Sequence, residues 1–292
     1  MYNQIDSNKR RTWLIIFVFT IFILLIGWFF GYYFEYGYGS VVVALIFATI
    51  MTAFSYYGGD KVALLTAGAQ AITKDENPYL YRLVENLSIA SGVPMPKVHV
   101  IPSEAINAFA CGRDPQHSSI AVTMGAIHKL ENEELEGVLA HELSHIKNYD
   151  IRLMTIVIVL VGLISILADW FLRSTLMGGK NDNNKNGFLM IIGLVLIILS
   201  PIIAKLIQLA ISRRREYLAD ASGSLMTRYP EGLAKALEKI KNDDQVLPNA
   251  STATAHLYIA NPFSASSNWL AKVFSTHPPI DERIKKLKEM AV

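Results

Sequence analysis

Near its centre the sequence reads His141-Glu142-Leu143-Ser144-His145. Residues that are four apart on an α-helix project from the same face, so the two histidines can bind one metal ion together. Glu142 lies beside them, where a water molecule on that metal would need a proton acceptor. The pattern therefore predicts a helix that carries a metal site, and other parts of the sequence have to supply the remaining ligands.

The pattern H-E-x-x-H on a helix is typical of zinc proteases. We expect the helix to cover 133–148, because glutamates at its start and Lys147 near its end suit the two ends of the helix dipole. The same charges indicate that the motif lies in water rather than in the middle of a bilayer. This separates the sequence from proteases whose metal-binding helix itself crosses the membrane.

The composition indicates membrane spans joined to a water-soluble part. Hydrophobic residues make up 52% of the 292 residues and charged residues only 18%, below the roughly 25% of a soluble domain. The net charge is +2, and no basic stripe with interleaved aromatic residues indicates nucleic acid as a partner. Cys111 is the only cysteine, which excludes an intramolecular disulfide and a cysteine-based zinc cluster.

Four runs of residues are long and apolar enough to cross a bilayer as helices, which takes about 20 residues each. They are 13–33, 40–57, 153–172 and 188–211. Lys9, Arg10 and Arg11 precede the first run, and three further arginines follow the last one. Because cytoplasmic loops carry the excess of Lys and Arg, we expect a multi-pass protein of the cell membrane with both termini in the cytoplasm.

These runs divide the chain into two membrane hairpins and two water-soluble stretches. The hairpins are 1–59 and 151–212, and the water-soluble stretches are 60–150 and 213–292. Both stretches fall on the cytoplasmic side, so we predict that they form one catalytic domain. Apolar residues at helical spacing predict a helix over 78–90, and β-branched residues between Pro, Gly and Ser predict short strands over 97–101 and 119–123. The expected fold class is α+β, mainly α, with four transmembrane helices and a cytoplasmic domain that contains a small β-sheet.

A catalytic zinc site needs three protein ligands and an open position. The downstream candidates for the third ligand are Glu216, Asp220, Glu231, Glu238 and His277. We favour Glu216, because a hairpin of two spans between His145 and Glu216 returns the chain to the same membrane face. Asp220, on the same helical face as Glu216, is then expected to accept a hydrogen bond from a ligand imidazole.

An alternative interpretation makes 213–220 only a charged helix at the membrane surface. Its arginines would contact anionic headgroups, and Glu216 and Asp220 would form surface ion pairs. The H-E-x-x-H pattern on the same side of the membrane argues for the metal site instead.

Three further stretches give the sequence a resemblance to a known family. They are Asn107-Ala108-Phe109-Ala110-Cys111-Gly112, Ser212-Arg213-Arg214-Arg215-Glu216-Tyr217-Leu218-Ala219-Asp220, and Ser275-Thr276-His277-Pro278-Pro279 followed by Glu282-Arg283-Ile284. With them the chain resembles, nearly end to end, the HtpX-type membrane zinc endopeptidases, which are related to the CAAX prenyl proteases. The four-span layout is similar too, and Cys111 departs from the threonine that is more usual in that family.

The resemblance implies a gluzincin fold with one zinc ion on His141, His145 and Glu216, and with Glu142 as the catalyst. It also implies that a substrate lies along an edge strand formed by Asn107, Ala108, Phe109 and Ala110. The physics agrees, since main-chain bonds to a sheet edge hold an extended peptide with little regard to its sequence.

His277 and Arg283 are, by the same resemblance, further candidates for catalytic residues. One of them would stabilise the oxyanion of the tetrahedral intermediate, and the other would orient Glu216 or Asp220. The sequence leaves open which residue does which.

We therefore expect a membrane-anchored zinc endopeptidase that cleaves misfolded or damaged membrane proteins on the cytoplasmic side, with polypeptides and the lipid bilayer as partners. The resemblance implies a role in quality control under stress. One rival is a non-catalytic membrane adaptor with structural zinc, which would usually need a fourth protein ligand and would leave Glu142 without a role. Another is a di-iron carboxylate oxidase, which needs paired Glu-x-x-His motifs, whereas Glu142–His145 is the only one here. The sequence does not indicate the oligomeric state.

Overall fold

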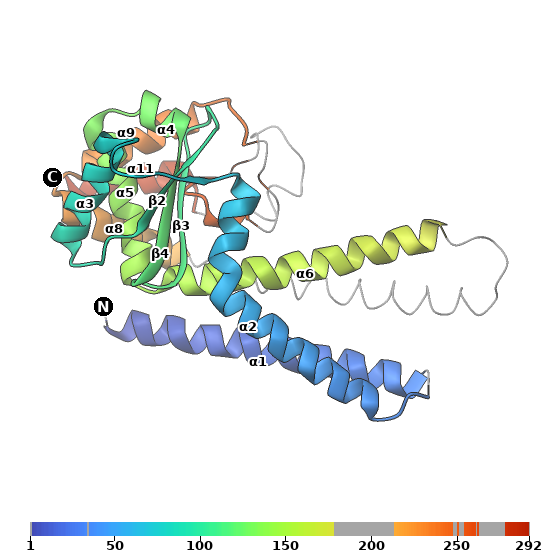
Figure 1. The fold of residues 1–292 in the computed structure, drawn as a ribbon. Helices are drawn as coiled ribbons and strands as arrows, with labels where there is room; N and C mark the ends of the chain where they lie inside the picture. Colours follow the sequence, from blue (N-terminus) through green and yellow to red (C-terminus); the bar gives the residue numbers. More distant parts are fainter. Residues whose placement is uncertain are drawn as a thin grey trace.

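The computed structural model describes residues 2–33, 35–177, 213–247, 250, 254–260, 262 and 278–291, and the fold is given for these residues. Long helices extend to one side, and a part with a small sheet and shorter helices lies at their other end (Figure 1). The mainly helical α+β class predicted from the sequence is confirmed for the described residues.

The first two helices form an antiparallel hairpin. They are α1 (Tyr2–Tyr33) and α2 (Gly39–Ala67), and they contain apolar stretches, Ile5–Tyr32 and Gly39–Ala67, that are long enough to cross a membrane. Trp13, Phe17 and Val43 are 66%, 63% and 67% exposed, so the hairpin presents large apolar side chains outward. The runs predicted at 13–33 and 40–57 are thus confirmed as candidate membrane helices, and α2 continues past the predicted end.

The helix α6 (Asp150–Met177) contains the run predicted at 153–172 and packs against the hairpin. One buried apolar cluster joins α1, α2 and α6, and it contains Ile15, Phe19, Ala48, Leu153 and Val157. That α6 itself crosses a membrane stays a prediction. The run predicted at 188–211 lies outside the described residues, so the fourth span also stays a prediction.

The sheet has the strand order β1-β2-β4-β3. The strands are β1 (Gln70–Ala71), β2 (Lys97–Ile101), β3 (Ala108–Asp114) and β4 (His117–Thr123). β2 and β4 are parallel, whereas β1–β2 and β3–β4 are antiparallel, so β3 is an edge strand. The strands predicted at 97–101 and 119–123 are confirmed, and β1 is too short to give a periodic pattern.

The two faces of the sheet pack against different helices because side chains alternate along a strand. On one face, Ala108 and Ala110 of β3 belong to the cluster that contains Leu139 of the central helix α5 (Asn132–Lys147). On the other face, Phe109 and Cys111 belong to the cluster that contains Ala63 of α2. α2 and α6 thus contact the sheet directly, so these long helices and the sheet pack as one structure.

The remaining helices of the described residues lie in the same part of the molecule as α5, which carries the H-E-x-x-H motif (Figure 1). They are α3 (Pro78–Ser91), α4 (Met124–Lys129), α8 (Arg213–Thr227), α9 (Pro230–Lys241), the short 3-10 helix η1 (Ala255–Leu257) and α11 (Ile280–Met290). The predicted helices at 78–90 and 133–148 are confirmed. Leu80 and Leu139 share one buried cluster with Leu237 and Leu287, so both water-soluble stretches contribute to one core. The exact domain boundaries stay a prediction.

Candidate metal centre

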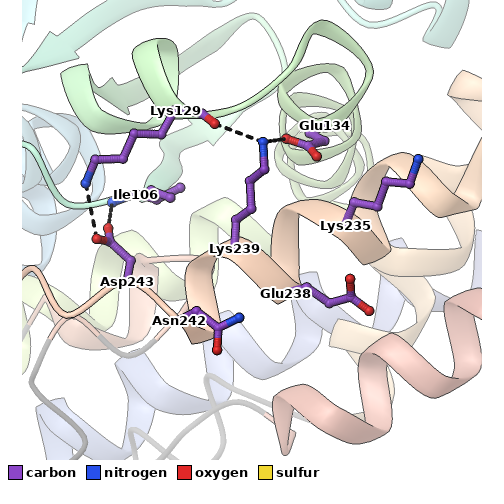
Figure 2. Close-up of a pocket in the computed structure, with 8 residues that line it drawn as sticks. All are labelled: Ile106, Lys129, Glu134, Lys235, Glu238, Lys239, Asn242 and Asp243. Atoms are coloured by element: carbon purple, nitrogen blue, oxygen red, sulfur yellow. Dashed lines mark hydrogen bonds and ion pairs between the residues drawn. The ribbon is translucent and has the colours of Figure 1, made fainter.

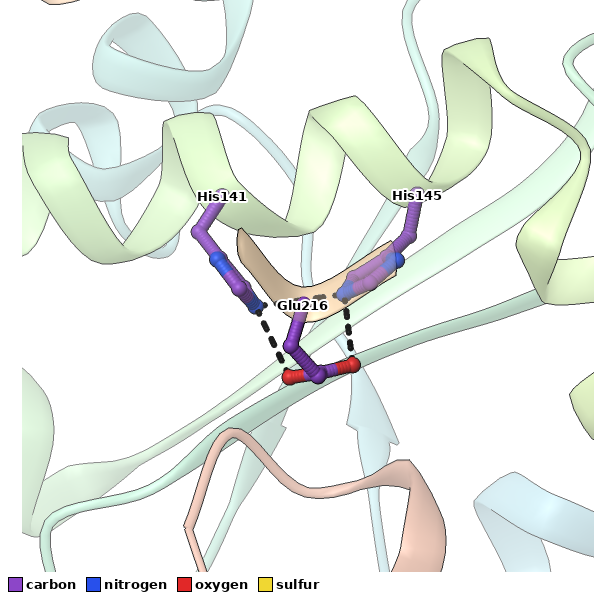
Figure 3. Close-up of side chains that lie close together, drawn as sticks. All are labelled: His141, His145 and Glu216. Atoms are coloured by element: carbon purple, nitrogen blue, oxygen red, sulfur yellow. Dashed lines mark hydrogen bonds and ion pairs between the residues drawn. The ribbon is translucent and has the colours of Figure 1, made fainter. Parts of the chain in front are cut away.

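Three buried side chains converge between α5 and α8 (Figure 3). The Nε2 atoms of His141 and His145 are 3.1 Å apart. The two carboxylate oxygens of Glu216 lie 3.8 Å from the Nε2 of His141 and 3.6 Å from the Nε2 of His145. One ligand atom from each residue lies within 4.8 Å of the other two. The three residues named from the sequence are therefore close enough to share one metal ion.

Two further carboxylates fix the imidazole rings. The Nδ1 atom of His141 lies 2.9 Å from an Asp220 oxygen, and the Nδ1 atom of His145 lies 3.0 Å from an Asp150 oxygen. Because a carboxylate accepts, each Nδ1 carries a proton, and a neutral ring then has its lone pair on Nε2. Two nitrogen lone pairs and a carboxylate then face one point, a donor set that fits a divalent cation such as zinc.

Asp150 is the functional residue that sequence reasoning missed. It follows His145 by five residues, beyond the spacing at which side chains on one helix meet. The chain turns sharply between α5 and α6, with Tyr149 at a φ of +60°, and this turn brings Asp150 back toward His145. An aspartate at the start of the next helix, just after H-E-x-x-H, was the available signal.

Arg283 of α11 holds Asp220 through a fork of two hydrogen bonds. Its Nε and Nη2 donate to the two Asp220 oxygens at 2.9 and 2.7 Å, and its Nη1 donates to the Ile259 carbonyl at 2.9 Å. Burial alone would raise the pKa of Asp220, but Arg283 and the bond from His141 outweigh it and lower the pKa to about 2. Of the two roles left open for Arg283, its contacts correspond to orienting Asp220. His277 lies outside the described residues.

The electrostatics of the two histidines also suit a cation. Burial lowers the pKa of His141 to about 4, so its ring is neutral. For His145 burial acts in the same direction, but the carboxylates of Asp150 and Glu216 outweigh it and raise the pKa to about 9. The negative charge that would hold a proton on His145 would equally favour a metal ion at this point.

Glu142 is buried beside the histidines, and its Oε2 has no hydrogen-bond partner among the described residues. Burial raises the pKa of Glu142 to about 7, although His145 and a backbone hydrogen bond from Ala110 act in the opposite direction. A carboxyl group with a pKa near neutrality can both accept and return a proton at physiological pH.

The stretch predicted as a substrate edge strand coincides with the start of β3, which lies at the edge of the sheet. Asn107 precedes the strand, and its side-chain oxygen accepts from the Ala108 amide at 3.0 Å. The Ala108 carbonyl accepts from the Ile259 amide at 3.0 Å, so the chain itself already pairs with this edge at one point. Ala110 lies farther along β3 and donates to Glu142.

Two of the other candidates for the third ligand, Glu238 and Glu231, are not among the three converging residues. Glu238 lines a hollow of about 620 Å³, shown in Figure 2 with Ile106, Lys129, Glu134, Lys235, Lys239, Asn242 and Asp243. Its charges pair with one another, since Lys239 lies 2.7 Å from Glu134 and Lys129 lies 3.1 Å from Asp243. Glu231 lies in the first turn of α9 and is not among the three converging ligands.

The chain is similar to known proteins over most of its length. Residues 74–291 match the model of peptidase family M48. A protein named Protease HtpX homolog from Dictyoglomus turgidum is 45% identical over 289 residues, which cover 99% of this chain and 94% of that protein. A homolog of the same name from Caldanaerobacter subterraneus is 44% identical over 298 residues, covering 100% and 98%. Among solved structures, the crystal structure of S. mikatae Ste24p matches 98% of this chain and 67% of that chain with a TM-score of 0.50 and 19% identity, a likeness of fold alone.

Proposed function

Because this chain belongs to peptidase family M48 and is a membrane metalloendopeptidase similar to the HtpX proteases, we propose that it is a zinc enzyme that cleaves misfolded or damaged membrane proteins at the cytoplasmic surface of the cell membrane. One observation carries the proposal: His141, His145 and Glu216 converge within 4.8 Å beside the buried carboxyl group of Glu142. The two candidate membrane helices next to this site support the membrane setting.

Zinc is the metal that fits the donor set best. Two imidazole nitrogens and one carboxylate, with a fourth position open to water, are the ligands that zinc takes in hydrolytic sites. When bound, zinc acts as a Lewis acid that polarises the scissile carbonyl and makes a water molecule more acidic. Asp220 and Asp150 hold the Nδ1 atoms of the two histidines, so that both Nε2 atoms would be available to a bound ion.

Glu142 acts as the general base and then as the general acid. It accepts a proton from the attacking water as the new C–O bond forms, and it returns that proton to the amide nitrogen as the C–N bond breaks. A pKa of about 7 suits both transfers. Arg283 positions Asp220, which leaves His277 as the residue for stabilising the oxyanion.

The substrate lies along the edge formed by Asn107, Ala108, Phe109 and Ala110. This edge faces α5, and the bond from Ala110 to Glu142 brings its backbone next to the general base. A peptide that pairs with β3 around Ala110 would therefore have its own main chain close to Glu142. Such a grip uses backbone groups and would accept many sequences, which suits an enzyme for damaged proteins.

The cytoplasmic side is inferred from the N-terminal residues. Asn8 of α1 hydrogen-bonds Asp150 in the metal centre at 2.7 Å, which supports the placement of the N-terminus and the active site on one side of the membrane. Lys9, Arg10 and Arg11 follow directly, and a basic cluster of this kind favours the cytoplasm.

Fragment mapping tests the proposal. The purified zinc-loaded protein is incubated in detergent with multi-pass membrane proteins of known topology, and the fragments are identified by mass spectrometry. Reconstitution of enzyme and substrate into liposomes then restricts the accessible loops. We expect cuts in cytoplasmic loops only, and none in chelator-treated enzyme. Cuts in external loops after reconstitution would refute the cytoplasmic assignment.

A further inference from the structure

Asn8 lies near the start of a candidate membrane helix, and its polar side chain is only 2% exposed. Its amide nitrogen donates to an Asp150 carboxylate oxygen at 2.7 Å and to the Asn148 carbonyl at 2.9 Å. Its amide oxygen lies 3.4 Å from the Nη1 of Arg215. Asn8 therefore contacts the metal-binding region from more than a hundred residues away in the sequence.

The orientation of the Asn8 amide follows from its partners. The Asn148 carbonyl and the Asp150 carboxylate can only accept hydrogen bonds, and the guanidinium of Arg215 can only donate. An amide turned the other way would place its oxygen against two oxygens and its NH₂ group against a cation. Asn8 is thus the donor to Asp150.

The two carboxylate oxygens of Asp150 contact different partners, one in the metal centre and one on the first membrane helix. One oxygen lies 3.0 Å from the Nδ1 of His145, and the other accepts from Asn8 and, at 3.3 Å, from Arg215. Since the carboxylate is planar, fixing one oxygen fixes the plane that the other oxygen presents to His145.

Asn8 also stabilises the corner at which Asp150 sits. This corner places Tyr149 at a φ of +60°, a left-handed conformation that residues other than glycine adopt at some cost. The bond from Asn8 to the Asn148 carbonyl ties down the residue before that turn, and the bond to Asp150 ties down the residue after it. One amide thereby joins the end of α5 to the start of α6.

We infer that Asn8 is a positioning residue for the metal centre, through which the first membrane helix sets the Asp150 carboxylate that orients His145. The inference rests on the proposed metal site and extends that site to α1. Without the Asn8 amide, Asp150 keeps its contact with Arg215 but loses its shortest hydrogen bond, so His145 is held less firmly.

The expected effect is a weaker grip on the metal. Loss of the outer partner of a metal ligand typically lowers metal affinity 10–100-fold. Asn8 acts one bond farther out, so we expect Asn8→Ala to lower affinity by roughly 3–10-fold, on the same basis. Asn8→Asp keeps the shape but replaces the donor with a second carboxylate facing Asp150, so its loss should be larger.

Cobalt binding provides a readout that is independent of proteolysis. Metal-free full-length protein in detergent is titrated with Co²⁺, the visible absorption bands report the ligand geometry, and competition with a chelator gives the Kd. Thr12→Val is the matched control, because Thr12 is equally buried on α1 and bonds only to the Asn8 backbone among the contacts described. The melting temperature of each metal-free variant monitors folding.

A double-mutant cycle decides whether Asn8 acts through Asp150. We expect Asn8→Ala alone to weaken Co²⁺ binding and to alter the absorption bands. Added to Asp150→Ala, it should cause no further loss of Co²⁺ affinity. The control Thr12→Val should bind Co²⁺ like the parent. If Asn8→Ala fails to fold, Asn8→Ser, which can keep one donor, replaces it in the same cycle. The inference would be overturned if Asn8→Ala bound Co²⁺ like the parent. It would also be overturned if Asn8→Ala lowered the Co²⁺ affinity of Asp150→Ala as much as that of the parent, or if Thr12→Val lost as much affinity as Asn8→Ala. If the parent itself shows no Co²⁺ bands that His141→Ala abolishes, the proposed metal site fails as well.

Discussion

Arg283 and Asp220 form a buried, two-point ion pair with hydrogen bonds of 2.7 and 2.9 Å, and Asp220 in turn contacts the Nδ1 of His141. The pair connects α11, near the C-terminus, to a metal ligand on α5. Its geometry explains why a residue so far from the H-E-x-x-H motif in sequence should matter for metal binding.

Arg283→Lys should weaken both metal binding and folding. Lysine keeps the charge but lacks the planar fork that binds both Asp220 oxygens and the Ile259 carbonyl together. Leaving a buried charge imperfectly paired costs about 3 kcal/mol or more. Thermal unfolding and metal affinity are measured beside Lys285→Ala, whose side chain is exposed on the same helix. An Arg283→Lys protein that matches the parent in both would contradict this role.

The stability of the metal-free protein should fall between about pH 4 and pH 2. Asp220 has a pKa of about 2 in the folded protein, below its ordinary value near 3.8. A lowered pKa contributes stability above the unfolded value, and that contribution is lost as the pH falls through the folded value. The contribution is about 2 kcal/mol, and Asp220→Asn should show a flatter decline over the same window. If the stability of the parent and of Asp220→Asn fell equally steeply with pH, the predicted contribution of Asp220 would be wrong.

Removal of the metal should abolish proteolysis and lower the melting temperature. A chelator strips the ion, and adding back zinc should restore both properties, because a ligand that binds only the folded state stabilises it. Glu216→Gln should behave like stripped protein even in added zinc. Glu238→Gln is the control, since Glu238 lies in the hollow of Figure 2 and pairs with Lys288.

Two adjacent glycines of α2 should respond differently to alanine. A Cβ on Gly59 would lie 2.8 Å from the Thr155 side chain of α6, whereas a Cβ on Gly58 would contact only Phe54 of its own helix, at 3.5 Å or more. We expect Gly58→Ala to be neutral or stabilising, because alanine favours a helix by about 1 kcal/mol over glycine. Gly59→Ala should be destabilising by about 1–3 kcal/mol, since close packing leaves no room.

Thermal unfolding of both variants in detergent checks this difference. Thr155 also accepts from the Gly112 amide of β3 at 3.0 Å, so crowding at Gly59 should reach the edge strand. Hydrogen exchange of the β3 amides should therefore increase in Gly59→Ala and not in Gly58→Ala. Equal stability of the two variants would show that α2 and α6 do not pack as closely as described.

The parts of the site that a periodic pattern encodes could be predicted from the sequence. The spacing of His141 and His145 predicts a shared helix face, and a two-span hairpin predicts that Glu216 returns to the same side. The place of Asp150 just after the motif is a signal, but its contact with Asn8 could not be predicted from periodicity, because it depends on a sharp corner at Tyr149 and on packing between α1 and α6. A periodic sequence pattern does not encode contacts of this kind.

The end of α2 likewise depends on tertiary contacts that the sequence pattern does not show. The predicted run 40–57 stops where Gly58, Gly59, Asp60 and Lys61 interrupt the apolar pattern, yet α2 continues through them to Ala67. The helix continues because Gly59 packs against α6 and Ala63 and Ala67 pack under the sheet. Tertiary contacts thus override local signals that usually end a helix.

The most direct test of the central claim is to measure zinc content and proteolysis on the same sample of Glu142→Gln. Glutamine has nearly the same shape as glutamate but cannot accept the proton, and Glu142 is not one of the three converging ligands. We predict that the variant retains as much zinc as the parent and has lost at least 10²-fold in cleavage rate, as expected when a general base is removed. A zinc-loaded Glu142→Gln protein that cleaves as fast as the parent would contradict the account.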